Sequence, residues 1–264
     1  MTGRYAILIP AVFVVFVVAW DLIVRVFQVP THMVPPPVMV AKALMRGLVA
    51  SPFARDGYWF HAGYTLAAAL LGFGLGSTAG IVIGTLISQW RSLEATLKPY
   101  IVAFQSLPKV ALAPIIAIWF GFGITSKVVI CALLTFFPLM VNSLEGFKSV
   151  EADRIELMRS LSATRWQVFR MVSLPSALPF IFAGLDMAIV YAIIGAIVGE
   201  FTSGRNGLGV LIVSMNYALD MAGAFSVFIV LSLMGITLSG LLNVIRRRVL
   251  FWAPAARQQR SIGA

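Results

Sequence analysis

The ionisable side chains of Lys109 and Asp186 lie inside long apolar runs of this chain, and that of Glu200 lies at the end of one. If those runs cross a membrane, each charge is costly to bury and marks a functional site by default. Lys109 lies between Pro108 and Pro114, where missing backbone hydrogen bonds would expose carbonyl oxygens to a cavity. We therefore expect a polar pathway around Lys109, although its long side chain would equally suit extension to the aqueous surface.

Asp186 falls near the middle of an apolar run. There it would either face the same pathway and contact a cationic or donor-rich solute, or pair with a polar group of another helix. Glu200 lies near Arg205 at the end of its run, which favours a structural or gating role over contact with a solute. Asn142 and Tyr191 are further pathway candidates, but such residues also commonly serve helix packing.

The sequence contains no motif for catalysis, metal binding or nucleotide binding. Its two histidines, His32 and His61, have no carboxylate at metal-ligand spacing. Cys131 is the only cysteine, so we expect no internal disulfide and a buried, small apolar role for its side chain. No Gly-x-x-x-x-Gly-Lys-Ser/Thr motif occurs. We therefore assign no catalytic residue, metal or cofactor to this chain, which disfavours a membrane-embedded enzyme.

The composition is that of a membrane protein. Hydrophobic residues make up 60% of the chain and charged residues 11%, with a mean hydropathy of +0.94. A soluble domain of this size would lack the polar surface needed to cover its core, whereas a bilayer solvates an apolar exterior. The net charge of +10 does not indicate a nucleic-acid partner, because the basic residues fall in short connections between apolar runs.

Six apolar runs predict about six transmembrane helices in an all-α integral membrane protein. They cover residues 6–24, 61–88, 99–120, 127–144, 177–198 and 224–245. We expect a first helix and outer loop over 1–60, a core over 61–250, and a basic tail over 251–264. With the N-terminus in the cytoplasm, thirteen Lys and Arg residues lie inside and six outside, which favours two cytoplasmic termini and places the polar segment 145–175 inside.

A row of glycines recurs every four residues in the second run. Gly72, Gly76, Gly80 and Gly84 share one helical face, where absent side chains let another backbone approach closely. This spacing predicts tight helix packing.

The polar segment 145–175 predicts two short cytoplasmic helices. Asp153 with Glu156, and Thr164 with Gln167, each have the spacing of a capping box, and Ser162 falls between them. The first helix carries an apolar stripe of Ile155, Met158 and Leu161. Such a hairpin would either dock a partner protein or lie among lipid headgroups, and these physical arguments leave both open.

The same segment, from Glu156 through Trp166 to Leu174-Pro175, resembles the EAA loop of ABC importer permeases. In that family the loop forms a coupling helix that docks in a groove of an ATPase subunit. Leu157-Met158 replace its two alanines and Ser162 replaces its glycine, and Ser162 would be strained if that position needs a positive φ. The resemblance implies ATPase coupling through Asp153, Glu156, Met158, Leu161, Ser162, Thr164, Arg165, Trp166 and Pro175.

A second set of motifs is similar to permeases of the nitrate, taurine and aliphatic-sulfonate importer group. These are Ser106 to Pro114, Ile118 to Gly123, Val198 to Phe201, and Gly207 to Gly209. The group also imports pyrimidine-type vitamin precursors, so the motifs imply a small organic or anionic solute without naming it.

The resemblance implies a type I importer permease in the inner membrane, working by alternating access. Its partners would be two ABC ATPase subunits that hold ATP and magnesium, a second and identical permease, and an extracytoplasmic substrate-binding protein. The main alternative is an autonomous ion-coupled transporter or channel that uses Asp186 or Glu200. Such transporters usually contain two related halves, and we find no internal repeat.

Overall fold

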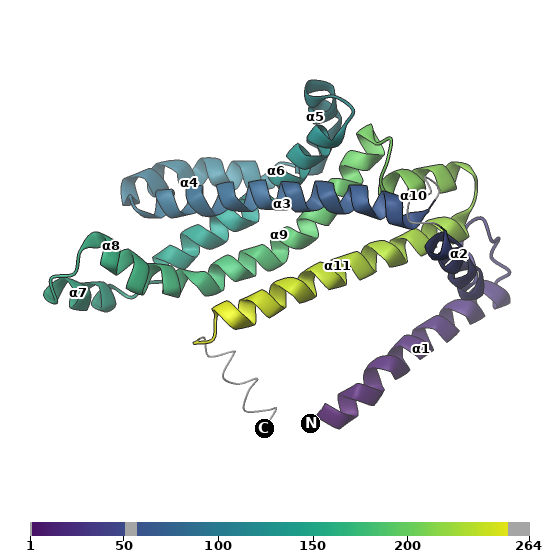
Figure 1. Ribbon diagram of the computed structural model, residues 1–264, viewed down its shortest axis with the longest axis horizontal. Coiled ribbons are helices and arrows are strands. Elements are labelled where there is room, and N and C mark those ends of the chain that lie inside the picture. Colours follow the sequence, from purple (N-terminus) through teal and green to yellow (C-terminus); the bar gives the residue numbers. More distant parts are fainter. Residues whose placement is uncertain (1, 51–56, 253–264) are drawn as a thin grey trace. The chain divides into compact units, whose positions relative to one another are not determined.

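The computed structural model describes residues 2–50 and 57–252, and every regular element within them is a helix (Figure 1). The expected all-α fold is therefore confirmed. In chain order the elements are α1 (Thr2–Val26), α2 (Pro37–Val49), α3 (Tyr58–Ser88), α4 (Arg91–Ser106), η1 (Lys109–Leu112), α5 (Ala113–Phe120), α6 (Ile124–Lys148), α7 (Ala152–Ser160), α8 (Arg165–Val168), η2 (Phe169–Ser173), α9 (Leu174–Ser203), α10 (Leu208–Tyr217) and α11 (Met221–Val249). Residues 253–264 of the predicted basic tail lie outside the described residues.

Among the described residues, four helices are long and apolar enough to cross a membrane: α3, α6, the continuous helix Arg165–Thr202 that contains α9, and α11. Each contains one of the predicted apolar runs. The bent pair formed by α4 and η1–α5 counts as a fifth span if its two arms are taken together. α1 spans the first predicted run with 25 residues, and its membrane crossing stays a prediction.

The third predicted run is broken into two arms that meet at an angle of 77°. Pro108 ends α4, because the residue before a proline is disfavoured in helical conformation, and Leu107 is accordingly extended at φ −67°, ψ 135°. We expected Pro114 to interrupt a helix, and it does not. It lies in the first turn of α5, where a missing N–H costs nothing.

The chain forms two compact units, which are described separately. One combines Met1–Tyr64 with Asn206–Leu233, and the other combines Thr65–Arg205 with Met234–Ala264. This division differs from the linear one expected from the sequence, because α3 and α11 each contribute to both units.

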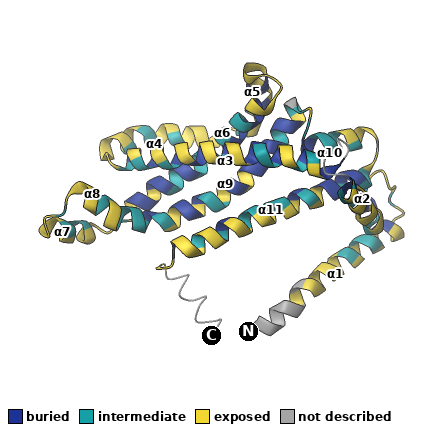
Figure 2. Cartoon of the chain, in the orientation of Figure 1, coloured by how far each residue is buried: buried dark blue, intermediate teal, exposed yellow. Residues whose placement is uncertain are grey.

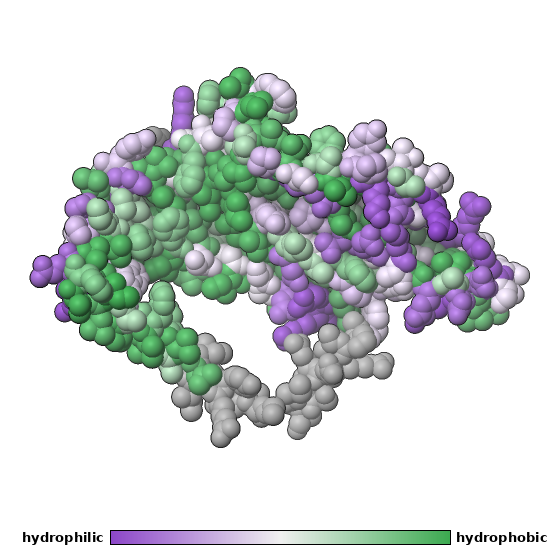
Figure 3. Space-filling model, turned by 180° about the vertical axis from the view of Figure 1, so that it is seen from behind, coloured by the Kyte–Doolittle hydropathy of each residue, from purple (hydrophilic) through white to green (hydrophobic). Residues whose placement is uncertain are grey.

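The larger unit has its core where α6 and α9 lie side by side with α3, as the dark residues of Figure 2 indicate. Small side chains permit this close approach: Ala68, Ala69, Cys131, Ala192 and Ala196 form one fully enclosed cluster. The Cys131 thiol is buried and donates to the Ala192 carbonyl oxygen at 3.3 Å, which confirms its expected packing role. Figure 3 shows mainly apolar surface over the long helices and a hydrophilic α7–α8 end.

The smaller unit joins its helices through buried polar contacts. The Tyr58 hydroxyl lies 2.6 Å from the Ser226 hydroxyl, and the His61 Nδ1 accepts from the backbone N–H of Gly207 at 3.0 Å. His61 thus has a structural role here. α10 was not predicted, because its ten residues are too few to form a membrane span.

Candidate functional site

The polar segment after α6 forms a helical hairpin, α7 and α8, whose first helix begins two residues earlier than predicted. Glu151 occupies the N-cap of α7 without a side-chain capping bond, and Asp153 lies inside the first turn. The prediction that Asp153 caps this helix together with Glu156 is therefore wrong. Asp153 still places a negative charge where the helix dipole favours one.

The end of α7 has the backbone geometry of a Schellman motif. The N–H of Ala163 bonds to the carbonyl of Met158 at 3.0 Å, and the N–H of Ser162 bonds to that of Arg159 at 2.9 Å. Ser162 has φ +57°, a left-handed conformation in which a Cβ atom is strained. The residue that replaces the family's glycine therefore lies at a position that favours glycine.

The predicted capping box at the start of α8 is present. Thr164 Oγ1 accepts from the backbone N–H of Gln167, and Gln167 Oε1 accepts from that of Thr164 at 2.7 Å. The cap directs an aromatic stack back to the long helices: Trp166 lies on Phe169, and Phe169 lies on Phe147 near the end of α6, with ring centroids 5.6 and 5.7 Å apart. The hairpin is therefore linked to α6.

A π-helical turn, η2, connects α8 to α9. Pro175 in the first turn of α9 has no N–H and its ring would clash with the carbonyl four residues earlier, and the wider turn relieves both problems.

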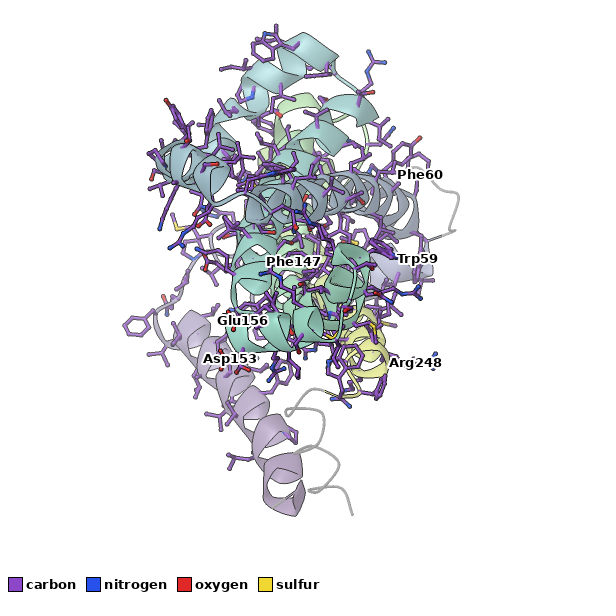
Figure 4. All side chains as sticks on the ribbon, turned by 90° about the vertical axis from the view of Figure 1, so that its left-hand side faces the viewer. Trp59, Phe60, Phe147, Asp153, Glu156 and Arg248 are labelled. Atoms are coloured by element: carbon purple, nitrogen blue, oxygen red, sulfur yellow. The ribbon has the colours of Figure 1, made fainter. Side chains whose placement is uncertain are left out.

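Most of the predicted coupling residues lie on the outer surface of the hairpin. Glu156, Leu161, Arg165 and Trp166 are exposed, whereas Met158 is half-buried. Figure 4 looks onto this end and places Asp153 and Glu156 at the periphery, with Phe147 nearer the centre of the bundle. Leu161 and Trp166 expose 71% and 66% of their surface, which gives the hairpin an apolar ridge open to a partner.

A cavity of about 400 Å³ opens inside the larger unit, between the end of α4, η1, α6 and α9. Its lining consists of Gln105, Lys109, Val110, Leu134, Phe137, Pro138, Val141, Asn142, Met187 and Tyr191. The α6 residues recur at helical spacing, as do the two from α9, so each helix presents one face to the cavity. A volume of this size is typical of sites for small organic molecules.

Three of the predicted pathway residues, Lys109, Asn142 and Tyr191, meet in this cavity from three different elements. The Lys109 ammonium donates to the Gln105 carbonyl oxygen at 2.9 Å and lies 4.9 Å from the centroid of the Phe137 ring. Pro108 and Pro114 shape the bend beside the cavity but do not line it.

The other two predicted pathway residues lie in ion pairs elsewhere in the larger unit. The Asp186 carboxylate accepts a hydrogen bond from Arg246 of α11 at 2.6 Å. Of the two roles expected for Asp186, the structure therefore shows pairing with a polar group of another helix. Glu200 is buried, accepts from Thr65 Oγ1 at 2.8 Å, and has the Lys127 ammonium 3.9 Å away. Neither carboxylate lines the cavity.

The four glycines of α3 all face α6. A Cβ atom at any of them would overlap α6 backbone or Cβ atoms, and the Thr135 hydroxyl bonds directly to the Gly72 carbonyl at 3.3 Å. α3 and α6 are thus in backbone contact along this row.

Sequence reasoning missed several residues at both sites. Gln105, Phe137 and Met187 complete the cavity, but nothing in an apolar run distinguishes a cavity-lining side chain from a lipid-facing one. The Phe147–Phe169 stack likewise joins residues 22 positions apart that only the folded hairpin brings together.

The fold and these two sites define a polytopic membrane protein with a broken helix beside a cavity and an exposed hairpin connected to the spans. Residues 72–251 match the family of binding-protein-dependent transport system inner membrane components. The chain belongs to this family, and it is therefore a permease subunit of an ATP-driven importer in the inner membrane.

Curated relatives in this family transport different solutes. The chain is 36% identical to a riboflavin transport system permease of Chloroflexus aurantiacus (92% of this chain, 89% of the relative). It is 35% identical to a formylaminopyrimidine transport permease of Halalkalibacterium halodurans (89% and 92%) and 28% identical to the taurine transport system permease of Escherichia coli (90% and 86%). The predicted family resemblance is confirmed.

A solved structure has the same fold. An inward-facing conformation of the MetNI methionine ABC transporter contains a chain that matches 79% of this one and 96% of its own length, with a TM-score of 0.63 and 20% identity. The predicted type I importer permease fold is thereby confirmed.

Proposed function

We propose that two identical copies of this chain form the translocation pathway of an importer for a small organic or anionic solute. Two ABC ATPases dock on the α7–α8 hairpins, and a substrate-binding protein delivers the solute from outside. Both termini lie in the cytoplasm, on the side where the basic hairpin and Arg246 to Arg248 at the end of α11 concentrate positive charge. Trp119 and Phe122, exposed beside the helix bend, offer apolar surface for the second copy.

One observation carries this proposal: α6 connects the hairpin to the cavity. Its C-terminal part bears Phe147, which stacks on Phe169 of the hairpin, and its middle bears Phe137 and Asn142, which line the cavity. Five residues, or about 7.5 Å of helix, separate Asn142 from Phe147. A movement of the hairpin is therefore transmitted to the cavity by a continuous helix.

The ATPase contact supplies the energy that the chain lacks. ATP binding closes the two ATPases, moves the hairpins together and biases the bundle from an inward-facing to an outward-facing state. The exposed Glu156 and the apolar ridge of Leu161 and Trp166 form the docking surface. The relatives named for riboflavin, formylaminopyrimidine and taurine transport support a small solute.

The test is co-purification of the tagged chain with co-expressed ABC ATPase subunits. We expect Glu156→Lys to lose the ATPase, because it reverses the charge of an exposed docking residue. Arg205→Glu is the matched control, since it reverses an exposed charge just beyond the opposite end of α9 and should retain the ATPase. Retention by Glu156→Lys, or transport in vesicles without any ATPase, would contradict the proposal.

A second variant tests the link through α6. Phe169→Ala removes the middle ring of the aromatic stack while leaving Glu156 in place. We expect the ATPase to remain bound and the solute transported per ATP hydrolysed to fall. Unchanged coupling in this variant would show that movement does not pass through the stack.

A further inference from the structure

The cavity between η1, α6 and α9 has a single charged residue. Of its ten lining residues only Lys109 is charged at neutral pH, and Asp186, which would have balanced it, pairs with Arg246 outside the lining. One unbalanced ammonium favours an anionic or carbonyl oxygen and repels a cation. The cavity therefore favours solutes that carry hydrogen-bond acceptor oxygens.

Lys109 is held by interactions that a ligand can replace. One of its three N–H donors bonds to the Gln105 carbonyl oxygen, and the ammonium lies over the face of Phe137. An aromatic ring of the ligand, stacked on Phe137, would displace the ammonium from the Phe137 face. An oxygen on the ligand ring would then accept a hydrogen bond from the displaced ammonium. The amide of Asn142, which donates to the Pro138 carbonyl at 2.8 Å, lies in the same wall.

The remaining walls suit a flat apolar body. Leu134, Val141 and Met187 supply aliphatic surface, and Phe137 and Tyr191 supply ring faces from two different helices.

We propose that this cavity binds a planar heteroaromatic solute with carbonyl or anionic oxygens on its edge, and that Lys109 determines this specificity. The ring lies against Phe137 and Tyr191, and an edge oxygen accepts from Lys109. A short aliphatic sulfonate would satisfy Lys109 but leave the ring faces uncovered, and a cationic ring would be repelled. This inference rests on the proposed function, because it assumes that the cavity belongs to the translocation pathway.

The experiment measures binding to the purified permease–ATPase complex in nanodiscs. Riboflavin is the probe, since it is a planar ring with carbonyl groups and its fluorescence is quenched on stacking. Taurine, an aliphatic sulfonate, and thiamine, a cationic ring compound, are the competitors. We expect quenching by the native complex, no displacement by taurine or thiamine at equal concentration, and displacement by orotate, a small planar carboxylate with ring carbonyls.

Variants assign the effect to the cavity. We expect Lys109→Met to weaken riboflavin binding about tenfold or more, and Lys109→Arg to restore most of it. Lys98→Met is the matched control, because Lys98 is an exposed lysine of α4 outside the cavity. Equal binding by Lys109→Met and Lys98→Met, or displacement by taurine as effective as that by orotate, would overturn the proposed specificity.

Co-purification of the same variants with the ATPase distinguishes failure of the proposed specificity from failure of the proposed assembly. If the ATPase is retained while binding ignores Lys109, the solute class is wrong and the importer assembly stands. If no ATPase associates with the native chain, the proposed assembly itself fails, whatever the cavity binds.

Discussion

The glycine row of α3 allows a quantitative test of how closely α3 and α6 pack. A Cβ atom at Gly80 would lie 2.6 Å from the Phe136 carbonyl oxygen and 2.8 Å from the Leu139 Cβ. Carbon and carbonyl oxygen normally approach to about 3.3 Å, so Gly80→Ala must separate the two helices by about 0.7 Å. The atoms in the way are backbone and Cβ, which no change of rotamer can move.

The matched control lies on the same helix. Gly74 is exposed, and a Cβ atom there would have no neighbour within 4 Å. Both substitutions gain helix propensity of up to about 1 kcal/mol, so this gain cancels in the comparison. The difference between the two variants is then the cost of overpacking, about 1–3 kcal/mol.

The assay is the thermal midpoint of the detergent-solubilised chain, measured by size-exclusion chromatography with fluorescence detection. Both variants are heated identically, because unfolding of such proteins is commonly irreversible. By the scaling for chains of this size, we expect Gly80→Ala to unfold roughly 2–12 °C below Gly74→Ala. Equal midpoints would refute the inference that α3 and α6 are in backbone contact.

Two further substitutions test other close contacts. Ser162→Gly should remove left-handed strain and stabilise the hairpin by about 1 kcal/mol, seen as slower amide exchange at Ala163 than in the native chain; faster exchange would contradict this reasoning. Lys127→Met leaves Glu200 buried without its ammonium neighbour and should cost about 3–5 kcal/mol, whereas adding Glu200→Gln should recover much of that loss. Additive losses of thermal stability would show that the two residues do not interact.

The sequence predicted those parts of the fold that depend on local chemistry. Apolar runs located α3, α6, α9 and α11, because a bilayer requires long apolar helices. The Thr164–Gln167 capping box depends only on residues three apart, and it is present. The Asp153 box failed because several residues near a helix start can serve as the cap, and their spacing does not decide which one does.

Features that depend on tertiary register could not be predicted. Arg246 is sixty residues from Asp186, and only the packing of α11 on α9 brings them to 2.6 Å. Lys109, Asn142 and Tyr191 were identified as polar residues in apolar runs, which is a property of each residue by itself. That they share one cavity, while Glu200 is buried beside Lys127, follows from how the helices face each other.

The arrangement of charges has a consequence for mechanism. Asp186 and Glu200, the two acidic groups that an ion-coupled transporter would need in its pathway, each have a basic neighbour and lie outside the cavity. The lining of the cavity therefore holds neither of the carboxylates that the ion-coupled alternative would use. Lys109 is the one charged residue of the cavity lining, and two helices join the cavity to the hairpin: α6 through the Phe147–Phe169 stack, and α9 through its continuous connection to α8.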